Sequence, residues 1–228
     1  MPGPRRDPPT APPAGPVDWR PQEFGHGFHN RADLLVEPGW GGVRVIAHVA
    51  QGRARFVDEE GVDCTAEFAE VAEALAASAL AGTMILDGHL TVEPTQPTEG
   101  VAVARPEAPG SAEIMGQMFF GKRRGRSDRP ARRLDPDRPV AFVAVDMLSI
   151  DDSSLLEVPL LERKRLLDSA ISQGDLVRVT PFVRPPIGTF VSTWRGLGFT
   201  QLAYKGANSR YRPGARNDDW SLTRMPPR

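Results

Sequence analysis

The sequence reads Val36-Glu37-Pro38-Gly39-Trp40-Gly41-Gly42-Val43-Arg44 at its most informative point. Apolar residues alternate with other residues on both sides of this glycine-rich turn, from Leu34 to Val49. Alternation with a period of two is typical of β-strands, and closely spaced glycines favour a tight turn. The segment therefore predicts a strand, a tight loop and a second strand.

Short strands and a few helices are predicted over the rest of the chain. Thr65 is a candidate cap for a helix whose apolar positions Phe68, Val71, Leu75 and Leu80 follow a 3.6-residue period. A second helix is expected over residues 159–171 and a short one over 189–196, with strands over 84–92, 140–148, 176–183, 200–205 and 220–224 and a loop over 94–110. Because strands and helices do not alternate strictly, the pattern favours an α+β fold.

Several segments resemble, in order and spacing, the signature motifs of the ATP-dependent DNA ligases. Residues 36–44 resemble the family's E-P-K-x-D-G-x-R, and Ile85-Leu86-Asp87-Gly88-His89-Leu90 resembles its I-L-D-G-E-L. Later matches are residues 142–148 to the F-D-x-L strand, 159–163 to P-L-x-E-R, 202–205 to V-x-K, 209–216 to S-x-Y-x-P-G-x-R, and Asp219-Trp220 to the last motif. The resemblance runs from about Leu34 to Arg224 and is closest to the ligase module of bacterial end-joining enzymes.

The resemblance implies an adenylation (nucleotidyltransferase) fold, with two antiparallel sheets flanked by helices around a nucleotide cleft. In this family a lysine amine attacks the α-phosphate of ATP in the presence of Mg²⁺, and the AMP then passes to the 5′-phosphate of a nick. Residues 19–228 are assigned to this domain, and no OB-fold domain is expected within the 228 residues.

Gly39 lies where the family has its nucleophilic lysine, and glycine has no side chain that could attack a phosphate. Further departures fall at Gly41, Glu59, His89, Val145, Thr200 and Leu222, where the family has an acidic residue, an arginine, a glutamate, an aromatic, a glutamate and a lysine. Among them, His89 and Thr200 replace the carboxylates that would hold ribose and metal. We therefore predict no catalytic residue, no metal site, and neither ATP nor Mg²⁺ as a cofactor.

Four polar residues are candidates for cofactor binding: the retained Arg44, Asp87 and Lys205, and Arg224, which lies where the resemblance implies a lysine. Their cationic members would form an anion site, a remnant of phosphate recognition. The alternative is that the retained positions, with Gly88, Asp146 and Trp220, only maintain the fold.

Composition limits the classes of protein to which the chain can belong. The formal net charge of -1 gives no overall attraction to nucleic acid, and Cys64 is the only cysteine, so no internal disulfide can form. No apolar run approaches the length of a membrane helix, and we expect a cytoplasmic protein with no membrane partner. Residues 1–18 are rich in proline and are expected to form a disordered tail.

A basic loop is predicted at residues 121–133. Lys122, Arg123, Arg124 and Arg126 are candidate nucleic-acid contacts that would follow the phosphate backbone. The alternative is a solvated insertion. His26 and His29 lack further ligands at zinc spacing, so no metal site is predicted there.

Three functions remain open on these observations. The first is a pseudo-ligase that lacks adenylation chemistry and has a non-catalytic role in DNA repair or recombination, with DNA ends, nicked duplex or another repair protein as partner. The second is an active ATP-dependent DNA ligase or nucleotidyltransferase, for which Lys205 would have to replace the missing nucleophile. The third is a nucleotide-sensing or scaffold module that uses the vestigial ATP cleft.

Overall fold

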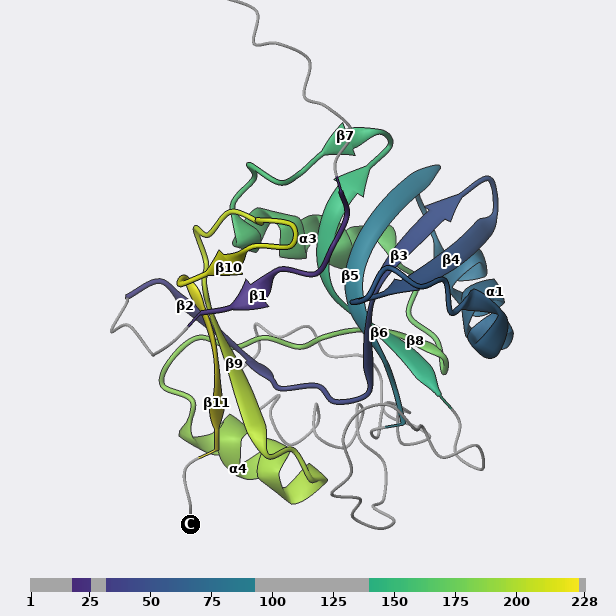
Figure 1. Ribbon diagram of the computed structural model, residues 1–228. Helices are drawn as coiled ribbons and strands as arrows, with labels where there is room; N and C mark the ends of the chain where they lie inside the picture. Colours follow the sequence, from purple (N-terminus) through teal and green to yellow (C-terminus); the bar gives the residue numbers. More distant parts are fainter. Residues whose placement is uncertain (1–17, 26–31, 93–139, 226–228) are drawn as a thin grey trace, which may run out of the picture.

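The computed structural model describes residues 18–25, 32–92 and 140–225 (Figure 1). Four predictions lie outside these residues, namely the proline-rich tail up to residue 17, the histidine pair, the loop over 94–110 and the basic loop over 121–133.

A six-stranded sheet forms the centre of the molecule. Its strands are β3 (Val43–Ala50), β4 (Arg53–Asp58), β5 (Thr83–Thr91), β6 (Ala141–Ile150), β7 (Ser153–Ser154) and β8 (Val177–Val179). The order β4-β3-β5-β6-β7 is antiparallel throughout, and β8 pairs with β6 in parallel. β6 is buried over nine of its ten residues, as its apolar sequence predicts for a strand that is covered on both faces.

Helices cover one face of this sheet. A 3-10 turn (Thr65–Phe68) leads into α1 (Ala69–Ser78), and α3 (Leu160–Ala170) contacts β6. The alternation along β3 directs Val45 and Ala47 into the core with these helices, whereas Ile46 packs into a second core on the opposite face. The sheet is therefore buried on both sides.

The helix prediction at Thr65 was wrong in two details. The Thr65 hydroxyl accepts a hydrogen bond from the Phe56 backbone N–H at 2.9 Å and does not cap α1. Leu80 lies beyond the end of α1 at Ser78 and is 66% exposed, because the chain is extended from Ala79 onward. Its periodic spacing alone could not show that the helix had already ended.

A three-stranded antiparallel sheet packs beside the central one. It contains β2 (Leu34–Pro38), β9 (Gln201–Gly206) and β11 (Trp220–Arg224), with β9 in the middle. The helix α4 (Gly188–Leu197) packs on one face through Val191 and Trp194, and it ends at Gly198, whose φ of 104° suits glycine. The strand predicted over 176–183 is shorter than expected, since β8 ends at Val179.

The N-terminal part of the described chain is tied to the C-terminal part. β1 (Glu23–Phe24) pairs in parallel with β10 (Arg216–Asn217). The Gln22 side-chain oxygen accepts hydrogen bonds from the Arg212 backbone N–H at 2.6 Å and from Asn217 Nδ2 at 3.1 Å. In Figure 1 this small ribbon is drawn above the three-stranded sheet and beside the central one.

The predicted α+β class is correct, and the two larger sheets are antiparallel apart from β8. The parallel ribbon of β1 and β10 and the strand β4 were not predicted. Within the described residues, no helix is long and apolar enough to cross a membrane.

Candidate functional site

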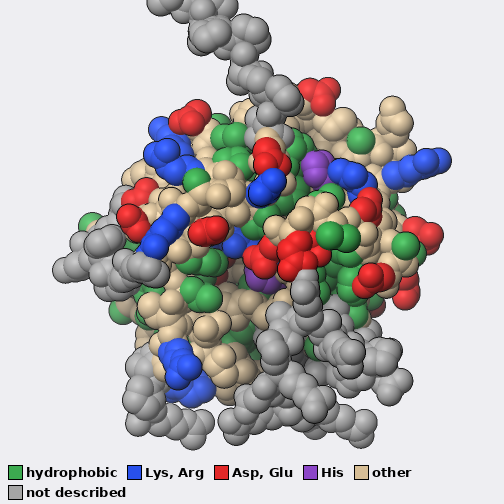
Figure 2. All heavy atoms as spheres, viewed as in Figure 1, with side chains coloured by type: hydrophobic (Ala, Val, Ile, Leu, Met, Phe, Trp, Pro, Cys, Tyr) green, Lys and Arg blue, Asp and Glu red, His purple; other side chains and the backbone are tan. Residues whose placement is uncertain are grey.

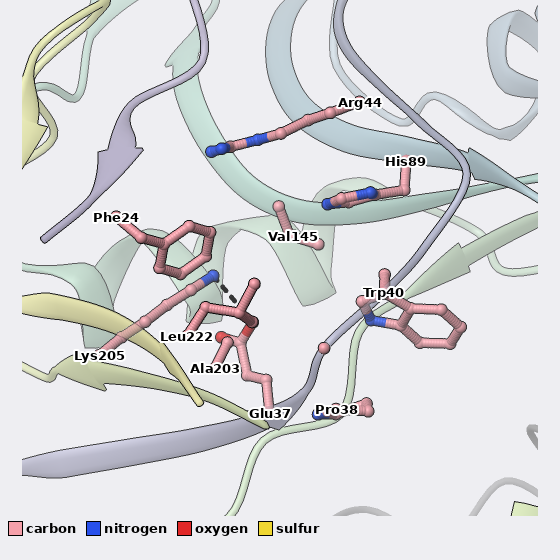
Figure 3. Close-up of a pocket in the computed structure, with 11 residues that line it drawn as sticks. Phe24, Glu37, Pro38, Trp40, Arg44, His89, Val145, Ala203, Lys205 and Leu222 are labelled. Carbon is pink, nitrogen blue, oxygen red and sulfur yellow. Dashed lines mark hydrogen bonds and ion pairs between the residues drawn. The ribbon is translucent and has the colours of Figure 1, made fainter. Parts of the chain in front are cut away.

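A small hollow, open to solvent, lies between the two larger sheets (Figure 3). Arg44 and His89 reach it from β3 and β5, and Ala203, Lys205 and Leu222 reach it from β9 and β11. Its remaining lining residues are Phe24, Glu37, Pro38, Gly39, Trp40 and Val145. The glycine-rich turn singled out in the sequence therefore forms one wall of the hollow.

Gly39 is pressed against β9. Its backbone N–H donates to the Gln201 carbonyl oxygen at 2.9 Å. A Cβ atom added at Gly39 would lie 2.7 Å from Gln201 Cβ and 3.0 Å from the Gln201 carbonyl carbon, both closer than van der Waals contact allows. A side chain at position 39 thus requires Gln201 and its backbone to move.

Glu37, two residues before Gly39, forms ion pairs with two lysines. Its carboxylate is 1% exposed and lies 2.5 Å from Lys164 Nζ and 2.8 Å from Lys205 Nζ. Burial alone would raise the pKa of Glu37, but the two ammonium groups lower it below its usual value. Burial lowers the pKa of Lys164 to about 8, against the opposing attraction of Glu37.

Lys205 contacts one acidic and one aromatic side chain. Besides its ion pair with Glu37, its ammonium group lies 4.2 Å from the centre of the Trp220 ring, a cation–π contact. Lys164, the other lysine that pairs with Glu37, donates a hydrogen bond to the Val145 carbonyl oxygen at 2.6 Å. The amine of Lys205 is therefore engaged with protein groups although it lines the hollow.

Arg44 forms a second ion pair on the opposite wall. Its guanidinium donates two hydrogen bonds to the fully buried Asp87 carboxylate, at 3.0 and 2.7 Å, and the Tyr211 hydroxyl donates to the same carboxylate at 2.9 Å. Burial would lower the pKa of Arg44 and raise that of Asp87, yet their mutual attraction reverses both shifts. Asp87 is thus occupied by partners within the protein.

His89 is a neutral imidazole in this hollow. Burial, followed by the charge of Arg44, lowers the pKa of His89 to about 3, so the ring carries no charge at neutral pH. Its Nδ1 atom is buried and has no hydrogen-bond partner among the described residues. A neutral ring cannot supply the negative oxygen ligands that Mg²⁺ prefers.

The residues at the hollow do not fit Mg²⁺. Among the described residues that line it, Glu37 is the only carboxylate, and its charge is engaged by the two lysines. Among residues 18–25, 32–92 and 140–225, no group of three or more histidine, cysteine, aspartate or glutamate side chains could hold a metal ion.

Several retained residues have a clear packing role. A Cβ at Gly88 would lie 2.4 Å from the Phe142 ring, and one at Gly42, whose φ is +92°, would lie 2.1 Å from the Leu90 carbonyl oxygen. Asp146 accepts two hydrogen bonds from Arg163, at 2.9 and 2.7 Å, and both side chains are fully buried. These contacts agree with the alternative that retained positions maintain the fold.

The predicted binding residues are only partly brought together. Arg44 and Lys205 line the hollow, and Asp87 lies behind Arg44. Arg224 is exposed and is not among the lining residues, but the alternation of β11 places it on the same face as Leu222, toward the rim. The nucleic-acid candidates from Lys122 to Arg126 lie outside the described residues.

Sequence reasoning missed the roles of Lys164 and Gln201. Lys164 follows Leu160 by four residues and precedes Leu167 by three, so the helical period already placed it on the buried side of α3. Gln201 meets Gly39 only because β2 and β9 pair, a contact that no local pattern reveals.

The chain matches the family described as "ATP dependent DNA ligase domain" over residues 26–221. It is 29% identical over 211 residues to the multifunctional non-homologous end joining protein LigD of Mycolicibacterium smegmatis. The aligned region covers 91% of this chain and 24% of that protein. It is 26% identical over 194 residues to a DNA ligase of Methanothrix thermoacetophila, covering 81% of this chain and 31% of that protein.

A solved structure has the same fold. The ligase domain of M. tuberculosis LigD superposes with a TM-score of 0.61 at 23% identity, covering 91% of this chain and 59% of that one. The chain thus spans about a quarter to a third of the two curated relatives described above. On the extent of the family match, the chain belongs to the ATP-dependent DNA ligase domain family.

Proposed function

We propose that this domain is a pseudo-ligase, which does not form the lysine–AMP intermediate and has a non-catalytic role in DNA repair or recombination by binding DNA ends or nicked duplex. The observation that carries the proposal is the contact between Gly39 and Gln201. The position that would bear the nucleophile has no side chain, and the space next to it is taken by the backbone and Cβ of β9.

The charges around the hollow support the same proposal. Adenylyl transfer needs a free amine and groups that stabilise the negative charge of the transition state. The Lys205 amine is paired with Glu37, and Asp87 is occupied by Arg44 and Tyr211. His89 and Val145 occupy two further positions of the wall. Among the described residues that line the hollow, a bound triphosphate would therefore meet no free carboxylate with which to share Mg²⁺.

The decisive experiment is incubation of the purified chain with ATP labelled at the α-phosphate, with Mg²⁺ or Mn²⁺, followed by denaturing electrophoresis. We expect no labelled protein band. An acid-labile band would contradict the proposal and favour an active nucleotidyltransferase. If that band disappeared in Lys205→Ala and persisted in Lys164→Met, Lys205 would be the substitute nucleophile.

Calorimetric titration with ATP separates the pseudo-ligase from a nucleotide-sensing or scaffold module. We expect weak binding or none, because Val145 offers no aromatic face and Glu59 adds a negative charge near Arg44. Tight, magnesium-dependent binding without a covalent adduct would favour the sensor. Titration of the same preparation with nicked duplex tests the DNA role directly.

A further inference from the structure

The net charge of -1 conceals two oppositely charged parts of the molecule. Residues 51–92 carry seven carboxylates that are exposed or half-exposed and two arginines, Arg53 and Arg55. Residues 176–225 carry six arginines that are exposed or half-exposed and two aspartates, Asp218 and Asp219. A charge separation of this size creates a potential that orients charged partners before contact.

The two parts lie on different sides of the structure. The acidic residues belong to β4, to the turn that follows it and to α1, at the right of Figure 1, whereas α4, β9 and β11 lie at the lower left. In Figure 2 the charged side chains that are visible at the lower left are basic, while acidic ones gather at the centre and right. We call the side formed by α4, β9, β10 and β11, together with the loop before α4 and the loop between β9 and β10, the basic side; Arg184 and Arg212 lie in these two loops.

Three arginines of the basic side have no carboxylate partner among the described residues, namely Arg184, Arg212 and Arg224. All three are exposed. By contrast, Arg210 lies 3.9 Å from Glu157 and Arg216 lies 3.8 Å from Asp218. Within the described part of the chain, no carboxylate neutralises Arg184, Arg212 or Arg224, so these side chains can offer their charges to an external anion.

The register of the three-stranded sheet separates two of these arginines. The bridge between Val36 and Val183 places Arg184 beyond β2, and Arg224 lies on β11 at the opposite edge. The sheet between them spans three strand spacings, or about 14 Å. A duplex offers a phosphate on each strand about every 3.4 Å along its axis, so an extended polyanion can meet both edges at once.

The surface chemistry fits a phosphate backbone better than it fits an acidic protein. Protein interfaces usually need an apolar core within the contact. The large hydrophobic side chains that are exposed among the described residues are Val62, Leu80 and Leu222, and only Leu222 belongs to the basic side, where it lines the hollow. Arginines with little exposed apolar surface around them are typical of backbone contacts.

We propose that the basic side faces duplex DNA and holds its phosphate backbone through Arg184, Arg212 and Arg224, with the acidic side of β4 and α1 turned away. The inference rests on the proposed DNA-binding function and adds the orientation in which the domain binds. It is independent of the basic loop at residues 121–133.

The test compares matched variants of the whole chain in fluorescence titrations with nicked duplex at several salt concentrations. The test variant is Arg184→Ala with Arg212→Ala and Arg224→Ala, and the control is Arg53→Ala with Arg55→Ala and Arg165→Ala, which removes three exposed arginines elsewhere. Each lost phosphate contact should reduce the slope of log affinity against log salt by roughly 0.9. We expect the test variant to lose up to about 2.7 in slope and the control to keep the slope of the parent chain.

Other outcomes overturn the inference in distinguishable ways. If the parent chain binds nicked duplex and both variants weaken equally, only total charge matters and no side is preferred. If only Arg123→Ala with Arg124→Ala and Arg126→Ala weakens binding, the contact lies in the basic loop and the DNA role survives. If polyglutamate of equal charge competes as well as duplex does, the surface is a site for acidic proteins. If the parent chain binds no duplex at low salt, the proposed function itself fails.

Thermal unfolding of each variant checks its fold, and the corresponding arginine-to-glutamine set provides a second series. Glutamine keeps most of the side-chain length and its hydrogen-bonding capacity but removes the charge. A loss of affinity that appears with alanine and not with glutamine would show that packing rather than charge was changed, and would overturn the inference.

Discussion

Two buried ion networks face the same hollow from opposite sheets, and they balance their charges differently. On the central sheet, Asp87 meets one cation, Arg44, and a neutral donor, Tyr211. On the three-stranded sheet, the single carboxylate of Glu37 forms ion pairs with the ammonium groups of Lys164 and Lys205. The first network is balanced and the second has a surplus positive charge. Burial lowers the pKa of Lys164 to about 8, and the neighbouring charge of Lys205 acts in the same direction.

The difference shows where the electrostatic cost of this site is concentrated. A buried ion is expensive unless a partner and hydrogen bonds compensate for its lost hydration. Because Glu37 neutralises two lysines, its loss would uncover two buried charges at once. The Glu37 network should therefore respond more strongly to mutation and to pH than the Asp87 network.

The largest expected effect is that of Glu37→Gln. Removing one partner of a buried ion pair costs about 3–5 kcal/mol, and we expect a loss of this size in urea unfolding. Asp87→Asn should cost less, about 2–3 kcal/mol, because the Arg44 side chain is 10% exposed at the hollow and can be hydrated. A greater loss for Asp87→Asn would refute the comparison. Adding Lys164→Met to Glu37→Gln should restore at least about 1 kcal/mol, because one uncompensated charge is removed.

A smaller effect is expected at the strand contact beside the Glu37 network. Gly39→Lys should lower the free energy of unfolding by about 1–3 kcal/mol, because its Cβ would overlap Gln201. The double variant with Gln201→Gly lacks the Cβ atom of residue 201, so it should recover part of the lost free energy of unfolding. Gly174→Ala is the matched control, since nothing lies within 4 Å of the added Cβ, and it should change stability by less than about 0.5 kcal/mol. Equal losses for the single and double variants would mean that Gln201 is not the obstacle.

The smallest effect separates the networks by pH. The pKa of Lys164 in the folded protein, about 8, lies below its ordinary value of 10.5, so the unfolded chain binds more protons between these values and stability should rise with pH there. Between pH 7.5 and 9.5 the Lys164 contribution should be about 2 kcal/mol. The Cys64 thiol has the opposite effect and should lower stability as pH rises. Burial, followed by the charge of Asp58, raises the pKa of this thiol to about 11.

The readout for this prediction is the difference between the parent chain and Lys164→Met, measured by urea unfolding across that pH range, since Cys64 contributes equally to both. The parent chain should gain stability relative to the variant as pH rises. Parallel curves for the two proteins would show that Lys164 is already neutral or fully stabilised by Glu37 at pH 7.5.

Much of the fold was predictable because its strands have strong local patterns. The continuous apolar run of β6 and the alternation around residues 36–44 each identified a strand, and the motif order identified the family. β4 was missed because Arg53–Asp58 is short and largely charged or half-buried. Its pairing with β3 depends on the positive φ of Gln51 and Gly52 in the intervening turn, a signal too brief to weigh alone.

The contacts within the site could not be predicted from the sequence. The sequence placed Gly39 at the nucleophile position, but it could not show that Gln201 lies against Gly39 or that Lys164 reaches Glu37. These contacts join residues more than a hundred positions apart and arise from strand pairing and helix packing. Sequence periodicity predicts which face of a helix or strand a residue occupies. It does not predict which distant residue that face contacts.

The ribbon that ties Gln22 to Asn217 also bears on how the chain reaches its folded state. The two residues are 195 positions apart, so this contact closes a loop that includes almost the whole domain. Chain closure over such a distance carries a large entropic cost, and contacts of high sequence separation slow folding. During synthesis β1 cannot pair with β10 until residue 217 has left the ribosome. Until then the Tyr211 hydroxyl lacks the hydrogen bond that it accepts from the Gln22 backbone N–H. The N-terminal strand is therefore expected to join the fold last.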